Sequence, residues 1–211
     1  MVAVLPNQHP EEERLLAYAT GSLGEVKSLL VATHLALCPL CRASVEAYEA
    51  ECGGWFDGLG GGAEDDRWSA MLAACDARLD TAVLPPPAPR STLPMTGPLV
   101  PEPLRGRLGR PLFDFGWNEI APAVWLSDWT VKDAQTTGCL LRMGPGAPVP
   151  PHHHSANEML LVLTGAFHDE YGHYRVGDVA DIPADTDHYA VAEHGGDCVC
   201  LFLLDGEIRF L

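Results

Sequence analysis

The chain has few basic residues: 13 Lys and Arg stand against 29 Asp and Glu, which gives a formal net charge of −16. The negative charge is divided equally along the chain, because residues 1–84 and residues 85–211 each carry a net charge of −8. A surface of this sign repels a phosphate backbone and attracts basic partners. We therefore expect no direct binding to nucleic acid. The charge either keeps the protein soluble or steers it toward a basic protein.

Long apolar runs are also missing. Residues 1–10 have neither the basic start nor the apolar core of a signal peptide. No stretch approaches the roughly 18 apolar residues that cross a bilayer, so we expect a cytoplasmic protein without a membrane partner. The seven cysteines, at positions 38, 41, 52, 75, 139, 198 and 200, are an odd number. In an intracellular protein this favours metal-binding or reactive thiols over a disulfide framework.

Proline divides the 211 residues into three parts. Nine prolines fall between Pro85 and Pro111, and neither a helix nor a central strand tolerates that density. The prediction is an extended linker over residues 85–111, which separates an N-terminal domain, residues 1–84, from a C-terminal domain, residues 112–211. The expected fold class is a two-domain α + β protein, with a small zinc-binding helical bundle followed by an antiparallel β jelly roll.

The N-terminal part shows helical spacing in four segments. They run from Glu11 to a stop at Gly21, then over residues 23–37, 39–51 and 65–80. Ser22 and Glu25 form a capping box at the start of the second segment, and Gly53 with Gly54 is expected to end the third.

The fourth segment carries an apolar stripe. Its members recur at helical spacing, i, i+3, i+4, i+7 and i+11: Trp68, Met71, Leu72, Cys75 and Leu79. A glycine-rich hinge joins this helix to the preceding one, so it need not pack on its own domain. The stripe either grips another protein or is the last face of a four-helix core.

A metal-ligand pattern joins the second and third helices. His34 and Cys38 lie four residues apart on one helical face, and Cys41 follows three residues later. Two thiolates and one imidazole are three of the four ligands of a tetrahedral zinc site. His9, the only His or Cys before His34, directly precedes the helix start at Pro10 and is the candidate fourth ligand. The alternative is a C-x2-C pair, redox-active or merely buried, with an incidental histidine.

The C-terminal part reads as short strands separated by Gly, Pro or Asp. Eight strands in about 100 residues are typical of an antiparallel sandwich or jelly roll. They are expected at Val124–Trp129, Thr137–Met143, Glu158–Leu163, His168–Tyr174, Asp178–Ile182, Tyr189–Val191, Asp197–Leu204 and Glu207–Leu211.

A second set of ligand-type residues falls among these strands. His152 and His154 share one face of an extended chain, and Glu158 at the start of the next strand can join them. With His188 they form a His3Glu set for zinc or another divalent metal such as iron, manganese or nickel. His153 is either a surface residue or a substitute ligand. Further on, two cysteines share one face of a strand and are either a redox pair or core packing: Cys198 and Cys200.

The spacing of this second set resembles the two motifs of the cupin family. The first motif, from Gly146 through the three ligands to Gly165, is matched at every fixed position. In the second motif, which runs from Gly177 through Pro183 to His188, Asp185 and Ala192 stand where the family has glycine and asparagine. The two departures concern a turn and a neighbour of the site, and the ligands themselves are present.

The order of these features resembles the ChrR family of zinc-binding anti-sigma factors. An H-x3-C-x2-C helical segment, a proline-rich linker and a cupin pair follow one another as in that family. Three further segments carry the likeness over nearly the whole chain: L-L-A-Y-A at 15–19, V-A-T-H-L-x-L-C-x-x-C at 31–41 and D-C-x-C-L at 197–201.

The resemblance implies a repressor of transcription that is not an enzyme. Its N-terminal domain would wrap an extracytoplasmic-function sigma factor, with the apolar stripe of the fourth helix as the binding face. Its cupin would sense an oxidative signal, singlet oxygen or an organic hydroperoxide, and permit release. The family's zinc ligands then fall on His9, His34, Cys38 and Cys41, and its cupin zinc ligands on His152, His154, Glu158 and His188.

Two other interpretations stay open at this point. The chain could be a metal-dependent, dioxygenase-like cupin enzyme with a zinc-stabilised helical interaction domain, which turnover of a small oxidisable substrate would reveal. Alternatively, the C-x2-C pair could be a thiol switch that ejects zinc on oxidation without any need for the cupin.

Overall fold

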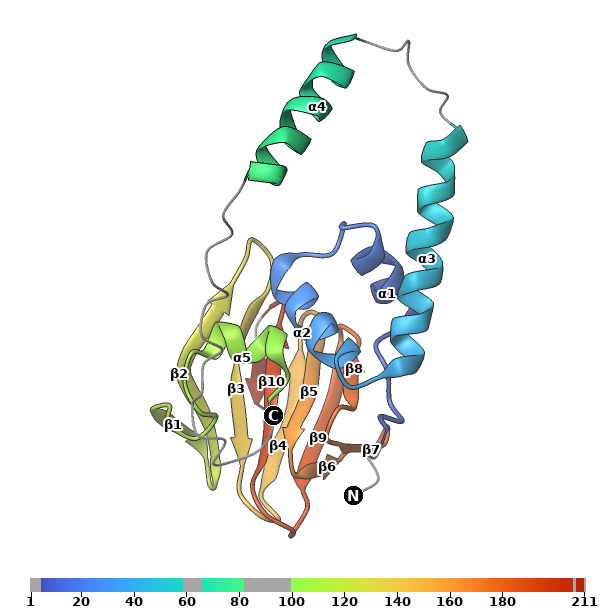
Figure 1. Cartoon of the computed structure of the whole chain (residues 1–211). Helices are drawn as coiled ribbons and strands as arrows, with labels where there is room; N and C mark the ends of the chain where they lie inside the picture. Colours follow the sequence, from blue (N-terminus) through green and yellow to red (C-terminus); the bar gives the residue numbers. More distant parts are fainter. Residues whose placement is uncertain (1–4, 59–65, 82–99, 207, 211) are drawn as a thin grey trace.

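A computed structural model describes residues 5–58, 66–81, 100–206 and 208–210, which form five helices and eleven strands (Figure 1). The helices are α1 Glu12–Ala19, α2 Glu25–Leu35, α3 Pro39–Gly58, α4 Asp66–Thr81 and α5 Glu102–Leu108. The strands are β1 Trp117–Ala121, β2 Val124–Lys132, β3 Thr137–Met143, β4 Pro148–His154, β5 Glu158–Thr164, β6 Ala166–His168, β7 His173–Arg175, β8 Val179–Ile182, β9 Thr186–Ala192, β10 Cys198–Leu204 and β11 Ile208–Phe210. Among these helices, none combines the length and the apolar character that a bilayer crossing requires.

The strands build two antiparallel sheets that face each other. One sheet has the order β1-β2-β3-β10-β5-β8 and the other β11-β4-β9-β6-β7. The expected fold class, a helical N-terminal region followed by an antiparallel β jelly roll, is confirmed. Two strands, β1 and β4, were not expected, and the strand expected over His168–Tyr174 is a hairpin of β6 and β7.

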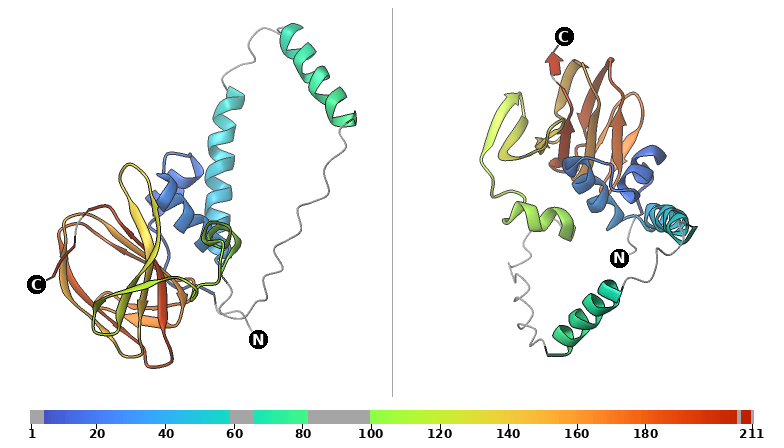
Figure 2. Two further views of the ribbon diagram at one scale, coloured as in Figure 1. Left: turned by 90° about the vertical axis from the view of Figure 1, so that its left-hand side faces the viewer. Right: turned by 90° about the horizontal axis from the view of Figure 1, so that it is seen from above.

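The central strands of the larger sheet are buried on both faces. In β5, Leu160 and Val162 point into the core between the sheets, while Leu161 points outward into a second apolar cluster. That outer cluster includes Val26 and Leu30 of α2, each fully buried. The helical and β regions therefore share a core, and Figure 2 shows α2 and α5 over this face of the sheet.

Two local expectations about the helices are wrong. α2 does not start with a capping box, because Ser22 Oγ donates to Ala17 O and Gly24 is the N-cap. Instead, the start of α2 is capped from the β domain. Asp133, in the turn between β2 and β3, accepts from the Val26 N–H through Oδ2 at 3.1 Å. In addition, α3 continues through Gly53 and Gly54 to Gly58. Glycine lowers helix propensity but keeps its N–H donor, so it weakens a helix without ending it.

The proline-rich stretch is not extended throughout. Residues 102–108 form α5, with Pro101 at the N-cap and Pro103 in the first turn, where a missing N–H costs no helical hydrogen bond. Leu104 and Leu108 of α5 are buried in the outer cluster beside α2. Residues 85–99 of the expected linker lie outside the described residues. The division of the chain at residues 84 and 111 remains a prediction.

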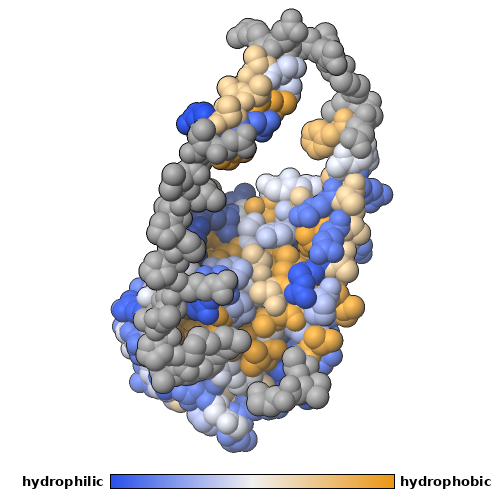
Figure 3. Space-filling view, viewed as in Figure 1, coloured by the Kyte–Doolittle hydropathy of each residue, from blue (hydrophilic) through white to orange (hydrophobic). Residues whose placement is uncertain are grey.

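α4 stands apart from the rest of the described structure (Figures 1 and 2). Trp68 is 59% exposed and Leu79 is 70% exposed, and Met71, Leu72 and Cys75 are exposed as well. Of the two expectations for this helix, packing in a four-helix core is therefore wrong. Figure 3 shows apolar surface on α4 and at the end of α3 nearest to it.

Candidate metal centres

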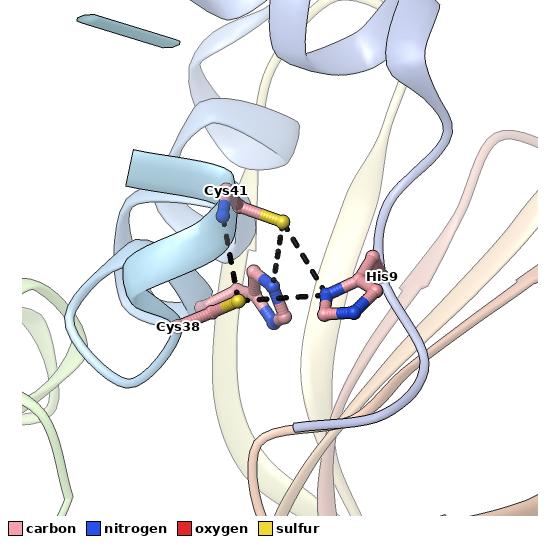
Figure 4. A group of neighbouring side chains, drawn as sticks. His9, Cys38 and Cys41 are labelled. Carbon is pink, nitrogen blue, oxygen red and sulfur yellow. Dashed lines mark hydrogen bonds between the residues drawn. The ribbon is translucent and has the colours of Figure 1, made fainter. Parts of the chain in front are cut away.

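The first candidate centre brings together His9, His34, Cys38 and Cys41. His9 lies in the segment before α1, His34 in the last turn of α2, and the cysteines where α3 begins. Figure 4 shows the His9 ring and the two sulfurs pointing toward one another. His9 Nδ1 lies 3.5 Å from Cys38 Sγ and 3.4 Å from Cys41 Sγ, and His34 Nε2 lies 3.3 Å from Cys41 Sγ.

These separations fit a tetrahedral ion. Zinc bonds of about 2.0–2.1 Å to nitrogen and 2.3 Å to sulfur place neighbouring ligand atoms roughly 3.5 Å apart. The four candidate ligand atoms all lie within 4.8 Å of one another. Two thiolates and two imidazoles in this geometry are typical of a closed structural zinc site.

A second contact orients His34. Its Nδ1 lies 2.7 Å from Gly177 O, in the turn between β7 and β8, so Nδ1 carries the proton and Nε2 faces the cysteines. Burial lowers the pKa of His34 and keeps the ring neutral, as a ligand must be. Burial, together with Cys38, raises the pKa of Cys41 to about 12, which a bound cation would reverse.

The second candidate centre lies between the two sheets. His152 and His188 are opposite each other on β4 and β9, His154 is two residues further along the same face of β4, and Glu158 begins β5. All four are buried and their ligand atoms also lie within 4.8 Å of one another. The ring centroids of the three histidines are 4.5–4.7 Å apart.

The buried polar atoms of this centre fit a cation. Both ring nitrogens of His154 and of His188 are buried and have no hydrogen-bond partner among the described residues. Glu158 comes within 3.3 Å of His154 Nδ1 and 3.6 Å of His188 Nε2 without the geometry of a hydrogen bond. A buried polar atom without a hydrogen-bond partner lowers the stability of the fold unless an ion or a water molecule binds it.

Burial shifts these four groups toward their neutral forms. It lowers the pKa of His154 to about 3 and that of His188 to about 4, helped by the neighbouring imidazoles, and it also lowers the pKa of His152. It raises the pKa of Glu158 to about 8, with a further contribution from Asp169. Neutral imidazoles are ready ligands, while the carboxyl must lose its proton to bind.

Asp169 is a neighbour of this centre that sequence reasoning missed. Its Oδ1 accepts from the Tyr171 and Gly172 N–H groups, each at 2.8 Å, and its Oδ2 lies 3.9 Å from His188 Nδ1. The two atoms form no hydrogen bond at this distance, so Asp169 is a buried acidic neighbour of the ring and does not fix its orientation. The sequence placed Asp169 within the strand expected over His168–Tyr174, and no local pattern relates it to His188.

The fold also shows the environment of the three motif positions left open by the sequence, His153, Asp185 and Ala192. His153 alternates to the other face of β4, where Nδ1 lies 2.7 Å from Asp187 Oδ1, so it is a surface residue and not a ligand of this centre. Asp185 has φ +57°, a left-handed conformation that glycine, Asn and Asp adopt most readily. The substitution of glycine by aspartate therefore preserves the turn. Ala192 is buried in the core at the end of β9.

Cys198 and Cys200 lie in the core between the sheets, with their sulfurs 3.8 Å apart. Both are fully buried. Burial, with Cys198 beside it, raises the pKa of Cys200 well above its ordinary value. A protonated thiol is a weak nucleophile, so this environment favours packing, and a redox role for the pair remains a prediction.

The residues expected to bind a protein partner lie far from both centres, on α4 (Figure 1). Sequence reasoning missed two further exposed apolar residues at the end of α3: Trp55 is 71% and Phe56 is 74% exposed. Two adjacent aromatic residues could have indicated a binding surface. They were overlooked because the helix was expected to end at Gly53.

A family model and two relatives match this chain. Residues 112–207 match the family described as the ChrR cupin-like domain. The chain is 36% identical over 203 residues to the anti-sigma-E factor ChrR of Cereibacter sphaeroides, which covers 96% of this chain and 91% of that protein. It also resembles the solved structure of ChrR of Rhodobacter sphaeroides in complex with SigE, with 34% identity, a TM-score of 0.77 and coverage of 95% of this chain and 100% of that one.

Proposed function

This chain belongs to the ChrR family of anti-sigma factors, and we propose that it represses transcription by sequestering an extracytoplasmic-function sigma factor. It is a regulator and not an enzyme, because the two relatives that match nearly the whole chain are ChrR anti-sigma factors. The dioxygenase-like alternative is therefore set aside. The observation that carries the proposal is the exposed apolar face of α4, in a chain whose preceding helices hold the ligand cluster His9, His34, Cys38 and Cys41.

The sigma-binding surface comprises the stripe of α4 and the aromatic end of α3. Exposed apolar side chains of this size on a soluble protein mark a binding site. An amphipathic helix that lies in a groove of a partner uses residues at i, i+3, i+4 and i+7, the spacing of the stripe. The net charge of −16 favours approach to the basic, DNA-reading faces of a sigma factor.

The first centre would act as a staple for this surface. His9, His34, Cys38 and Cys41 would hold zinc, and a bound zinc ion would cross-link the chain before α1 to the junction of α2 and α3. The small cluster around Leu15, Val31 and Val45 is limited in size, so a metal cross-link would contribute a large part of the stability of α1 and of the start of α3.

The β domain would act as the sensor. Its ligands His152, His154, Glu158 and His188 would hold zinc or another divalent metal, and an oxidative signal, singlet oxygen or an organic hydroperoxide, would act there to release the sigma factor. A buried centre between the sheets supports this role, because β5 and β10 place side chains both in this inner core and in the outer cluster that contains α2, so a change at the centre can reach the helical region through one strand. Cys198 and Cys200, which also lie between the sheets, are the candidate redox pair.

We further propose that residues 1–84 form the sigma-binding domain, residues 85–111 the connection and residues 112–211 the sensor. The thiol-switch interpretation of the C-x2-C pair remains an alternative for release. It predicts that peroxide removes zinc from the first centre even when His188 is replaced by Ala.

The function is tested by co-expression of tagged chain with candidate extracytoplasmic-function sigma factors. We expect the wild-type chain to retain one sigma factor in stoichiometric amount, and Leu72→Asp to lose it. Ala70→Asp introduces the same charge on the opposite side of α4 and is the matched control, since both residues are exposed. Capture of no sigma factor by the wild type, or equal capture by Leu72→Asp, would contradict the proposal.

A further inference from the structure

The segment that carries His9 is held by the β domain. Asp178, which follows the turn between β7 and β8, accepts from the Asn7 N–H at 2.6 Å and from the Gln8 N–H at 3.1 Å through Oδ1. In return, the Val179 N–H donates to Gln8 O at 3.1 Å. Three hydrogen bonds thus fix the two residues that immediately precede His9.

The same turn also holds His34. Gly177 O accepts from His34 Nδ1 at 2.7 Å, and Asp178 Oδ2 accepts from the Arg175 N–H at 2.8 Å, which closes the turn. Asp178 is 2% exposed. A carboxylate buried this deeply needs its hydrogen bonds, so three backbone N–H groups keep it in one place.

Gly177 leaves no space for a side chain at this contact. Its φ is +92°, and a Cβ there would lie 2.8 Å from Pro6 Cγ and 3.3 Å from Leu37 Cδ1. Pro6 belongs to the segment of His9, and Leu37 precedes Cys38. The turn therefore touches the chain beside three of the four candidate ligands of the first centre.

We propose that Asp178 is a positioning residue of the His9/His34/Cys38/Cys41 centre, and that through its turn the β domain sets how tightly that centre holds its ion. Two of the four ligands then depend on atoms of the other region: His9 on the Asp178 carboxylate and His34 on the Gly177 carbonyl. This inference rests on the proposed metal binding at the first centre.

The turn also leads to the second centre. It continues directly into β8, a strand of four residues that pairs with β5, where Ile182 is opposite Glu158. A displacement of Glu158 can thus reach Asp178 along one short, hydrogen-bonded strand. The two candidate centres are connected by backbone, which gives the sensor a direct route to the staple.

The test is cobalt binding by the full-length protein. Thiolate ligation gives cobalt(II) a charge-transfer absorption, and only the first centre contains sulfur among its ligands, so this band reports that centre alone. Two variants perturb the turn through different atoms: Asp178→Asn removes the charged acceptor, and Gly177→Ala pushes Pro6 and Leu37 away. The matched controls are Asp197→Asn, a half-buried carboxylate paired with Arg142, and Gly195→Ala, where a Cβ meets nothing within 4 Å.

We expect each turn variant to weaken cobalt binding at the first centre by roughly 10- to 100-fold, the usual effect of losing a residue that orients a ligand. The two controls should stay within about twofold of the wild type. Far-UV circular dichroism and zinc binding at the second centre check that each variant is folded. A folded Asp178→Asn or Gly177→Ala protein that binds cobalt like the wild type would overturn the inference.

This outcome is separable from that of the proposed function. Cobalt binding needs no sigma factor, and sigma capture by the wild-type chain needs no turn variant. If the wild type captures a sigma factor while the turn variants bind cobalt normally, the positioning role fails and the anti-sigma function stands.

Discussion

The two candidate metal centres differ in what holds their ligands in place. In the first, the ligands come from a coil segment, the end of one helix and the start of another, which pack around a small cluster. In the second, they are placed by paired strands, with His152 opposite His188 and Glu158 opposite Ile182. An ion in the first centre would therefore create local structure, while an ion in the second would occupy a site that the sheets have already formed.

The largest expected effect comes from breaking the first centre. Cys38→Ser should lower the free energy of unfolding by more than about 5 kcal/mol, because structural zinc contributes on the order of 10 kcal/mol in small domains. The helical signal in circular dichroism should fall with it. His188→Ala is the comparison: it should lose the ion of the second centre and keep the helical signal. If Cys38→Ser and the wild type have the same free energy of unfolding, the claim that an ion at the first centre creates local structure is wrong.

A smaller effect tests whether the two regions unfold together. Leu30 is fully buried between α2 and the sheet, so Leu30→Ala should cost about 2–5 kcal/mol. We expect chemical denaturation followed by circular dichroism and by tryptophan fluorescence to shift to the same extent. Leu16→Ala, at an exposed position of α1, should cost less than about 1 kcal/mol. A shift confined to the helical signal would mean that the regions unfold separately.

The smallest expected effect is a dependence of folding stability on pH that comes from the buried histidines of the second centre. Burial lowers the pKa of His154 to about 3, below its unfolded value, so its contribution to stability is present above pH 6.5 and is lost as the pH falls. Glu158 acts in the opposite sense, because its raised pKa, about 8, favours the folded state as the pH falls. We therefore compare metal-free wild type with metal-free His154→Gln.

Between pH 6.5 and 5.5 the stability of the metal-free wild type should fall by about 1 kcal/mol relative to His154→Gln. Denaturant titrations at the two pH values measure this difference. The metal-loaded wild type should show less of it, since a ligated imidazole takes up a proton only when the ion leaves. An unchanged difference between the two proteins would show that His154 is not desolvated.

Local patterns predicted much of the fold and of both ligand sets. The spacing of His34, Cys38 and Cys41 placed three groups at one helical junction, and the alternation of His152 and His154 placed two on one face of a strand. His9 was expected from the chain order, and the structure brings it beside both sulfurs. Besides the adjacent aromatic residues Trp55 and Phe56, a local feature left unused was the unbroken apolar run of β5 and β10, which is typical of strands buried on both faces.

Other elements could not be read from local patterns. Pro150 and Pro151 conceal β4, but they fall where its ladder with β9 is interrupted between Val149 and His152, so their missing N–H groups break no regular pairing. α5 was hidden by prolines that stand where a helix tolerates them. In each case the effect of proline depends on the neighbouring backbone, which the residue type does not specify.

The sequence by itself determined which residues could be ligands and which helix would carry an apolar face, because helical and strand periods fix the relation between near neighbours. Only the tertiary structure decided that Asp133 caps α2, that Asp169 lies near His188, and that the turn at Gly177 and Asp178 contacts His34 and the residues that precede His9. These contacts join residues more than 100 positions apart or cross between strands. No local period relates such residues, so they exist only once the sheets and helices have packed.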